Sequence, residues 1–550
     1  MAQASHSKDE DNNRLSGGDA LFLHLEREGM PLNVASVSVF EGVIALKPCT
    51  RFIESKLPLI PRYRQRLVIP PFNIGNPTWE YDPDFDICNH VHEVVLKRGT
   101  ETELKKVAGQ VLSKVLDRRR PLWDFTLVRG LTGNRTAIIT RMHHCLADGL
   151  AGVALLNVLM DSSPKSPSLR KMKLAPLPTS SPSNAATQVL DGLITSSFSV
   201  AQRVLSAEME FIDLVQKLLA ADQNHVEFDS HSQAGSHPAA RIPTLDEFTR
   251  FMPEVTSITQ RLPFNVMCRG SQRFTWTEIP LEEIKAVKNA LGATVNDVIL
   301  AIMTSTMRRY VEMRGVRVRG RLLRFGVPVN VRNGKADPNI SSLGNRITFI
   351  PVTVPLDIRN PRKQLAAIRQ RIMFLKSAHV AELVGLAGSV LGAIPMGAQV
   401  IAGSIANELP LGLCNMVCTN VPGPESPLYL MTHKLIRCYP YVPIGGDLGL
   451  NCAVLTYDGI AHFGFSGNVQ AAPRMDSLER FLQASFAELQ KAARVGRRTK
   501  LHAKKNLVVR KKPAASQKHV EAVKTVMSAE TASVIESQQS SSNVPLPTAV

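Results

Sequence analysis

Residues 139–153 read Ile-Thr-Arg-Met-His-His-Cys-Leu-Ala-Asp-Gly-Leu-Ala-Gly-Val, and this stretch joins a strand-like segment to a helix-like one. The preceding run Thr136–Met142 is mostly apolar and holds two β-branched isoleucines, a composition typical of a buried strand. Leu150–Met160 is apolar almost throughout and long enough for a core helix. The sequence therefore predicts that the pair His143-His144 lies at the end of a strand, on the turn into a helix.

The two histidines supply a candidate proton acceptor. Imidazole has an unperturbed pKa near neutrality, so it can take a proton from an alcohol and pass it on. Neighbouring residues at a strand end point to opposite faces, so only one of His143 and His144 can enter a given cavity, and we expect the other to bond to the backbone. Asp148 could hold a ring nitrogen or an arginine, and Gly149 could adopt a turn closed to other residues.

A metal site is the rival interpretation of the same residues. Two histidines and one aspartate could bind zinc or iron, but neighbouring histidines rarely share one ion. Metal-binding helices instead place histidines four residues apart, with a further ligand elsewhere. We therefore expect no metal.

The string His143-His144-(x)3-Asp148-Gly149 resembles the HHxxxDG signature of the CoA-dependent acyltransferase superfamily. Other motifs narrow the resemblance to the bacterial wax ester synthase/diacylglycerol acyltransferase family, over about residues 15–490. They are Leu15-Ser16-Gly17-Gly18-Asp19-Ala20, Pro61-Arg62-Tyr63-Arg64-Gln65-Arg66, Asp82-Pro83-Asp84-Phe85-Asp86, His90-Val91, Pro121-Leu122-Trp123, Asn296-Asp297 and Asn420-Val421-Pro422-Gly423-Pro424. HHxxxDG alone would also admit condensation domains and carnitine-type enzymes, whereas the combination is more specific.

The resemblance implies a long-chain O-acyltransferase that uses acyl-CoA. Its acceptor would be diacylglycerol, giving triacylglycerol, or a long-chain alcohol, giving a wax ester. In the family the second histidine of the pair is the general base, which here is His144, with His143 supporting it. The resemblance carries Asp148 over as a structural, orienting residue and Gly149 as a backbone turn.

Asn296 is a candidate oxyanion donor, because the Asn-Asp pair is the family's other polar motif. The alternative is a brace at a helix N-terminus, with Thr294 or Asn296 as the cap. A thioester is already electrophilic, so direct attack by the acceptor suffices and no serine nucleophile is required. We expect no bound cofactor beside the co-substrate acyl-CoA, and the sequence assigns no CoA-binding residues.

Two other functions stay open at this stage. One is a condensation-type or polyketide-associated acyltransferase, which would take a carrier-bound acyl group in place of acyl-CoA. The other is a non-catalytic lipid- or nucleic-acid-binding protein that acts through its basic C-terminal segment.

The implied fold is α/β, with two chloramphenicol-acetyltransferase-like domains, a long crossover linker and a substrate tunnel between the domains. Strands mixed with helices in both halves agree with it. We expect five segments: a disordered N-terminus (1–14), an N-terminal acyltransferase domain with HHxxxDG (15–161), a Ser/Pro-rich crossover linker with a helix (162–245), a C-terminal acyltransferase-like domain (246–493) and a basic, mostly disordered tail (494–550).

Periodicity and turn residues predict individual elements. The expected helices are Thr102–Asp117, Ala185–Ala220, Leu281–Leu291, Thr294–Met313 and Pro361–Ser377. The expected strands are Trp123–Val128, Leu322–Val331, Ile347–Val354, Asn415–Asn420 and Leu448–Tyr457. The turn Gly133-Asn134 should join Trp123–Val128 to Thr136–Met142 as an antiparallel hairpin.

Composition agrees with a large globular protein rather than a fibre or a membrane channel. The 550 residues are 44% hydrophobic, enough for more than one core, and the eight cysteines include no CxxC pair. We therefore expect reduced thiols in a cytoplasmic protein, and the polar residues 1–14 are unlike an export signal. Leu383–Ile405 has 23 residues without a charge but includes five glycines and Pro395, so we expect a core or interfacial helix rather than a span.

The net charge of +18 is concentrated near the C-terminus. Residues 491–524 hold twelve Lys and Arg against the single acidic residue Glu521. Such a segment suits an anionic membrane or lipid-droplet surface. We do not expect a nucleic-acid partner, because no aromatic residues are interleaved with these charges. The expected location is the cytoplasm, peripheral on the inner face of the membrane or on lipid droplets.

Overall fold

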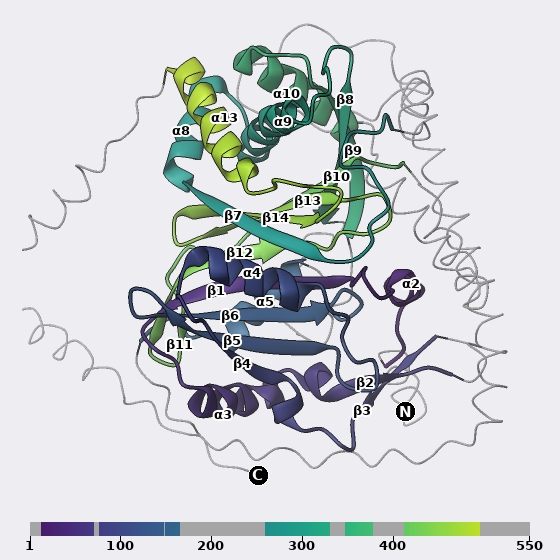
Figure 1. The fold of residues 1–550 in the computed structure, drawn as a ribbon, viewed down its shortest axis with the longest axis vertical. Coiled ribbons are helices and arrows are strands. Elements are labelled where there is room, and N and C mark those ends of the chain that lie inside the picture. Colours follow the sequence, from purple (N-terminus) through teal and green to yellow (C-terminus); the bar gives the residue numbers. More distant parts are fainter. Residues whose placement is uncertain are drawn as a thin grey trace, which may run out of the picture. The chain divides into compact units, whose positions relative to one another are not determined.

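The computed structural model describes residues 13–70, 76–147, 149–164, 259–330, 347–377 and 412–494. The chain divides into two units, 1–495 and 496–550, and all described residues belong to the first. They form two six-stranded sheets, a two-stranded ribbon and the helices around them (Figure 1). The predicted α/β architecture is confirmed, whereas the substrate tunnel stays a prediction. Four predicted features lie outside the described residues: Asp148, the linker helix Ala185–Ala220, the uncharged stretch Leu383–Ile405 and residues 495–550 of the basic tail.

The first sheet has the strand order β11-β12-β1-β6-β5-β4. Its strands are β1 (Asn33–Glu41), β4 (Val91–Val95), β5 (Trp123–Leu131), β6 (Arg135–His143), β11 (Tyr429–Leu430) and β12 (His433–Tyr441). The predicted hairpin is confirmed, since β5 and β6 pair antiparallel around Gly133 and Asn134. Both turn residues have positive φ angles, 79° and 53°, which glycine and asparagine tolerate best.

Helices and a small ribbon surround the first sheet. They are α2 (Gly17–Leu25), α3 (Leu46–Lys56), α4 (Glu101–Leu112), α5 (Gly149–Leu159), the 3₁₀ turns η1 (Leu57–Leu59), η2 (Pro61–Arg64) and η4 (Ile87–Asn89), and the paired strands β2 (Gln65–Val68) and β3 (Thr78–Tyr81). The helix predicted at Thr102–Asp117 is present as α4 but ends at Leu112. Its N-terminus is capped by Thr100, whose side chain accepts a hydrogen bond from the backbone of Glu103.

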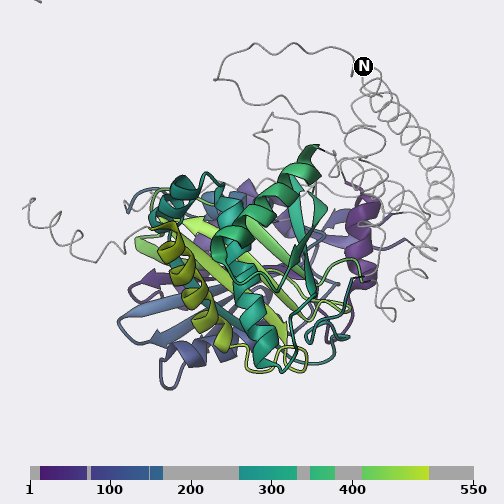
Figure 2. The same cartoon turned by 90° about the horizontal axis from the view of Figure 1, so that it is seen from above.

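The second sheet has the order β7-β14-β13-β10-β8-β9. Its strands are β7 (Gln272–Pro280), β8 (Leu322–Asn330), β9 (Ile347–Pro355), β10 (Met416–Pro422), β13 (Leu450–Tyr457) and β14 (Ile460–Asn468). Its helices, α8 (Leu281–Leu291), α9 (Val295–Met313), α10 (Pro361–Ser377) and α13 (Ser477–Ala493), lie together on one face of it (Figures 1 and 2). The predicted helices and strands of this half are confirmed, with ends that differ by a few residues.

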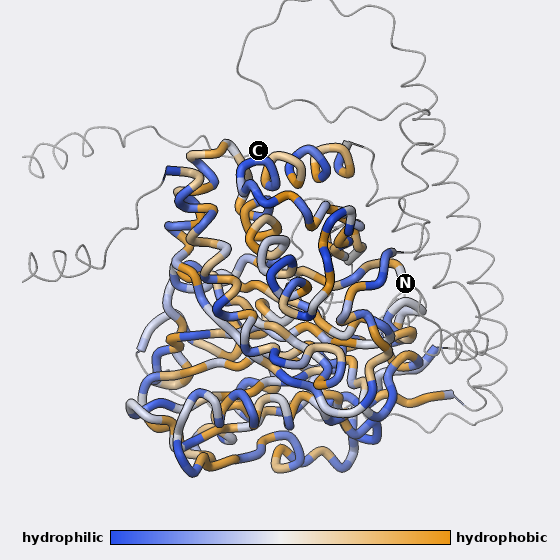
Figure 3. The backbone as a smooth tube through the Cα atoms, turned by 45° about the horizontal axis from the view of Figure 1, so that its top comes forward, coloured by the Kyte–Doolittle hydropathy of each residue, from blue (hydrophilic) through white to orange (hydrophobic). Residues whose placement is uncertain are grey.

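Apolar and polar residues alternate along these helices, as the hydropathy colouring of Figure 3 shows. On α8, for example, Ile284 and Val287 are buried in the core while Lys285 is exposed. The middle of α9 differs, because every residue from Asp297 to Arg308 is buried. Among the described residues no single helix has the length and hydropathy to cross a bilayer, and one bent pair, α8 with α9 at 100°, reaches those values only together.

The C-terminal part of the chain contributes strands to both sheets. Residues 429–441, which the sequence places in the C-terminal domain, form β11 and β12 of the first sheet. Strand β12 pairs antiparallel with β1, with Ala35 opposite Tyr441. The domain boundaries stay predictions, but a cut between 245 and 246 would not separate the two sheets.

Replacing Gly464 with alanine is expected to destabilise the junction between the sheets. A Cβ atom at this position of β14 would meet the carbonyl oxygen of Pro440 on β12 and the ring of Phe274, so backbone and ring must both move. We expect the free energy of unfolding to fall by about 1–3 kcal/mol. Urea titration would measure it. The matched control is Gly152→Ala on α5, where nothing lies within 4 Å of the added methyl and alanine favours the helix. Equal effects of the two substitutions would contradict the packing argument.

Candidate active site

At the histidine pair the backbone is fixed by hydrogen bonds to two different segments of the chain. Strand β6 ends at His143, whose backbone N–H donates to the carbonyl of Leu122 at 3.0 Å. The next N–H, of His144, donates to the carbonyl of Leu32, just before β1, at 2.9 Å. Helix α5 begins at Gly149. The strand–turn–helix arrangement predicted around the motif is therefore confirmed.

The side chain of His143 is fully buried and held by polar neighbours. Its Nδ1 accepts a hydrogen bond from the backbone N–H of Cys145 at 3.1 Å, which leaves the proton on Nε2. That Nε2 lies 3.4 Å from Oε2 of Glu26. Both ring nitrogens of His143 thus face the scaffold, Nδ1 in a hydrogen bond and Nε2 toward the Glu26 carboxylate beyond hydrogen-bond geometry.

Glu26 anchors this corner of the site. Its buried carboxylate accepts hydrogen bonds from the backbone N–H of Leu32 at 3.0 Å and from Arg118 at 3.1 Å. Burial acts to raise the pKa of Glu26, but the interactions with His143, Leu32 and Arg118 outweigh it and lower the pKa. Glu26 is therefore an anion under the histidine pair.

His144 presents its ring differently. The residue has intermediate exposure, its Nδ1 is buried, and its ring stacks on Phe22 with a centroid distance of 4.1 Å and an interplanar angle of 8°. Burial, with a smaller contribution from the neighbouring His143, lowers the pKa of His144 to about 4. The imidazole is therefore neutral at pH 7, the state in which it can accept a proton.

Two residues that the sequence analysis missed, Phe22 and Glu26, come from one element. Phe22 lies on α2 and Glu26 is its C-terminal cap, four residues further on and so on the same helix face. Helix α2 begins within the motif Leu15–Ala20, where the side chain of Ser16 accepts a hydrogen bond from the backbone of Asp19 at 3.0 Å. The motif is part of the family pattern, so the sequence did point to this segment. It did not show which side chains of the following helix would face the histidine pair.

Gly149 follows Asp148, which lies outside the described residues, so its role as a backbone turn stays a prediction. It begins α5, and a Cβ atom there would lie 3.4 Å from Cγ2 of Val421. This contact brings the Asn420–Pro424 motif of the second sheet beside the HHxxxDG loop.

Three further motifs meet beneath the β5–β6 hairpin. The buried indole of Trp123 donates to the carbonyl of Tyr63 at 2.8 Å. The ring of His90 stacks on Trp123 at 4.4 Å, and its Nδ1 contacts the Trp123 carbonyl at 2.8 Å. In this way Pro121–Trp123, Pro61–Arg66 and His90-Val91 build one aromatic support for the hairpin.

Asn296 is the second residue of α9 and is partly buried. The cap of this helix is Thr294, which forms a reciprocal capping box with Asp297 at 2.8 and 3.1 Å. Of the two predicted caps, Thr294 is therefore the one found. The role of Asn296 as an oxyanion donor stays a prediction.

Metal ligation was also considered for the described residues, which leave out Asp148. Within them, no three His, Cys, Asp or Glu side chains are grouped so as to hold a metal ion. The expectation of a metal-free site stays a prediction.

Comparison with known proteins gives the class of this one. The model of the wax ester synthase/diacylglycerol acyltransferase catalytic domain matches residues 15–299, and that of the family's C-terminal domain matches residues 343–490. The chain therefore belongs to the wax ester synthase/diacylglycerol acyltransferase family and is an acyltransferase. The resemblance predicted from the motifs is confirmed.

Individual relatives agree over nearly their whole length. The probable diacylglycerol O-acyltransferase tgs1 of Mycobacterium tuberculosis is 28% identical over 492 residues, covering 87% of this chain and 96% of the relative. Its tgs2 counterpart is 28% identical over 483 residues, covering 86% and 98%.

Two solved structures share the fold. The wax ester synthase/diacylglycerol acyltransferase of Marinobacter aquaeolei VT8 matches with a TM-score of 0.59 and 22% identity, covering 87% of this chain and 99% of that one. The first condensation domain of the CDA synthetase matches with a TM-score of 0.51 and 13% identity, covering 88% and 97%.

Proposed function

We propose that this acyltransferase moves the acyl group of a long-chain acyl-CoA onto the hydroxyl of a diacylglycerol, with His144 as the general base. The observation that carries the proposal is that the two histidine side chains have different surroundings. Nδ1 of His143 accepts a hydrogen bond from Cys145 and Nε2 faces the Glu26 carboxylate, whereas His144, a residue of intermediate exposure just after β6, has a neutral imidazole. The choice of diacylglycerol rests on the two mycobacterial relatives named for that acceptor.

The proposed reaction needs only one proton carrier. As the acceptor hydroxyl attacks the thioester carbonyl, its proton passes to His144, and a C–O bond forms in a tetrahedral intermediate. Collapse of the intermediate breaks the C–S bond, and the leaving CoA thiolate takes the proton from His144. The ester product leaves, and the imidazole is again neutral. Asn296 is the candidate that would stabilise the oxyanion.

In this mechanism Phe22 and Glu26 position the base. The parallel phenyl ring fixes the plane of the His144 imidazole, so that less conformational freedom is lost on the way to the transition state. Glu26 orients His143 and, through the N–H of Leu32, the backbone segment whose carbonyl holds the N–H of His144.

A comparison of two acceptors is the decisive experiment for the proposal. Consumption of palmitoyl-CoA would be measured with dipalmitoylglycerol and with hexadecanol under identical conditions. We expect a higher kcat/KM with dipalmitoylglycerol. Turnover with the alcohol alone would overturn the choice of acceptor and make the protein a wax ester synthase. Turnover only with a carrier-bound acyl group would favour the condensation-type alternative.

The proposed place of action is an anionic lipid surface, at the inner face of the membrane or on lipid droplets. Diacylglycerol resides in bilayers, so the acceptor must be drawn from one. Residues 491–524 carry twelve Lys and Arg, each of which contributes up to about 1 kcal/mol near an anionic leaflet. No nucleic-acid partner enters the proposal.

The pH dependence of kcat/KM should reflect the lowered pKa of His144. His144 acts as a base in its neutral form, which prevails above its pKa of about 4 rather than above the ordinary 6.5. We therefore expect kcat/KM to stay level from about pH 8 down to about pH 5 and to fall only below that. Initial rates in a constant-ionic-strength buffer series would test this, with intrinsic fluorescence as the control for folding. A fall centred near pH 6.5 in folded protein would contradict it.

A further inference from the structure

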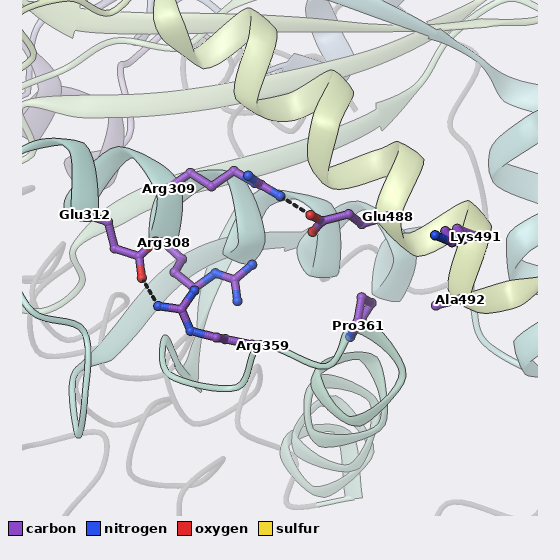
Figure 4. Close-up of a pocket in the computed structure, with 8 residues that line it drawn as sticks. All are labelled: Arg308, Arg309, Glu312, Arg359, Pro361, Glu488, Lys491 and Ala492. Carbon is purple, nitrogen blue, oxygen red and sulfur yellow. Dashed lines mark hydrogen bonds and ion pairs between the residues drawn. The ribbon is translucent and has the colours of Figure 1, made fainter.

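A second polar site lies among the helices of the second sheet. It is a pocket of about 570 Å³ between α9, the start of α10 and the end of α13 (Figure 4). Its walls are Arg308, Arg309, Glu312, Arg359, Pro361, Glu488, Lys491 and Ala492. The acyl-transfer mechanism uses none of these residues.

The pocket has more positive than negative charge. Arg309 pairs with Glu488 at 2.5 Å and Arg359 pairs with Glu312 at 2.6 Å (Figure 4). These two pairs use both carboxylates that line the pocket. Among the described residues neither Arg308 nor Lys491 forms an ion pair of its own, so the four cations of the pocket outnumber its two carboxylates.

Arg308 is the most telling of these cations. Its residue is only 4% exposed, and its Nε has no hydrogen-bond partner among the described residues. Burial lowers the pKa of Arg308; the charge of Glu312, and to a smaller extent that of Glu488, opposes this shift, while the charges of Arg359 and Arg309 add to it. A buried N–H donor without an acceptor costs free energy, and neighbouring cations add to the cost of a buried positive charge. An anion in the pocket would remove both penalties at once.

The neighbouring helix ends already have hydrogen-bond partners within the protein. The first N–H groups of α10 are capped by the side chain of Asn360, at 3.0 and 3.1 Å. The carbonyl of Ala492 near the end of α13 accepts a hydrogen bond from Arg362 at 2.7 Å. What the pocket lacks is therefore a hydrogen-bond acceptor that faces the arginines.

We propose that this pocket binds a phosphate group, carried either by a lipid headgroup or by a soluble phosphorylated compound. Several guanidinium groups converging on a small space match the geometry of phosphate oxygens, which accept paired hydrogen bonds from arginine. The surplus of two positive charges suits a phosphate better than a single carboxylate. The pocket is thus a binding site separate from the acyl-transfer centre.

The first experiment measures binding of inorganic phosphate and pyrophosphate to the full chain by calorimetry at constant ionic strength. We expect saturable binding, weakened at least about tenfold by Arg308→Met and several-fold by Lys491→Ala. The matched control Lys285→Ala removes an exposed cation of α8 outside the pocket and should bind like the unchanged protein. Equal affinity in all four proteins, or no saturable binding, overturns the proposal.

Thermal unfolding without phosphate separates a ligand-binding arginine from a structural one. Arg308→Met keeps the apolar stem and removes the buried charge, so Tm should stay level or rise. A large fall in Tm would mean that Arg308 serves the fold, and Lys491→Ala, which changes an exposed side chain, would then decide the binding question. Acyl transfer should be unchanged in Arg308→Met and in Lys285→Ala.

Vesicles distinguish the two sources of phosphate. Sedimentation would compare vesicles of phosphatidic acid in phosphatidylcholine with phosphatidylcholine alone. Weaker binding of Arg308→Met than of Lys285→Ala to the phosphatidic acid vesicles assigns the pocket to a headgroup. Equal vesicle binding, together with lost pyrophosphate binding, assigns it to a soluble compound.

Discussion

Replacing His144 with alanine is expected to lower kcat by about a hundredfold or more while the fold stays intact. The acceptor hydroxyl then loses its proton without a positioned base. The backbone N–H that donates to Leu32 remains, so the loop should keep its course. Steady-state assays would give kcat, and circular dichroism with thermal unfolding would report the fold.

Two other histidine variants make the result specific. His92→Ala changes an exposed residue of β4 and should leave activity unchanged. His143→Ala should cost stability, because it removes the ring beside the buried carboxylate of Glu26, and should affect the chemical step less. A folded His143 variant that loses more activity than the His144 variant would reverse the assignment.

Replacing Asp124 with alanine is expected to lower the free energy of unfolding by about 3–5 kcal/mol. Asp124 on β5 and Arg141 on β6 form a buried, two-pronged ion pair across the hairpin. Arg141 also donates to the carbonyls of Val111 and Lys114 at 2.6 and 2.7 Å, at the end of α4. Without the aspartate, a buried guanidinium keeps its charge and loses its partner.

The control for Asp124 lies on the neighbouring strand. Glu93 of β4 pairs with Arg129 of β5 at 2.7 Å, but both side chains are partly exposed. Glu93→Ala should therefore cost about 1 kcal/mol or less. Urea unfolding of both variants, with equal dependence on urea concentration, gives the comparison. Similar losses would show that burial does not set the strength of the Asp124–Arg141 pair.

Local patterns in the sequence predicted local structure well. Helix α10 has the bounds Pro361–Ser377 that its periodicity indicates, and the β5–β6 hairpin turns at Gly133-Asn134 as expected. In each case the determining residues are neighbours in the chain, so the period or the turn type is visible directly.

Contacts between distant segments were not predictable in the same way. Nothing near Asn33–Glu41 indicates that this strand lies between β6 and β12, and its place brings Leu32 to His144. For that reason Phe22 and Glu26 could not be assigned to the site, although the motif before them was noted.

The pairing of β12 with β1 also bears on how the chain is made. Ser38 and Cys438 face each other on these strands although 400 positions separate them in the chain. During synthesis one edge of β1 must therefore wait, unpaired, until nearly the whole protein has left the ribosome. An open edge of this kind is prone to pair with other chains. We expect the two halves, when produced as separate polypeptides, to aggregate rather than to fold as independent modules, and the intact chain to depend on chaperones that shield this edge.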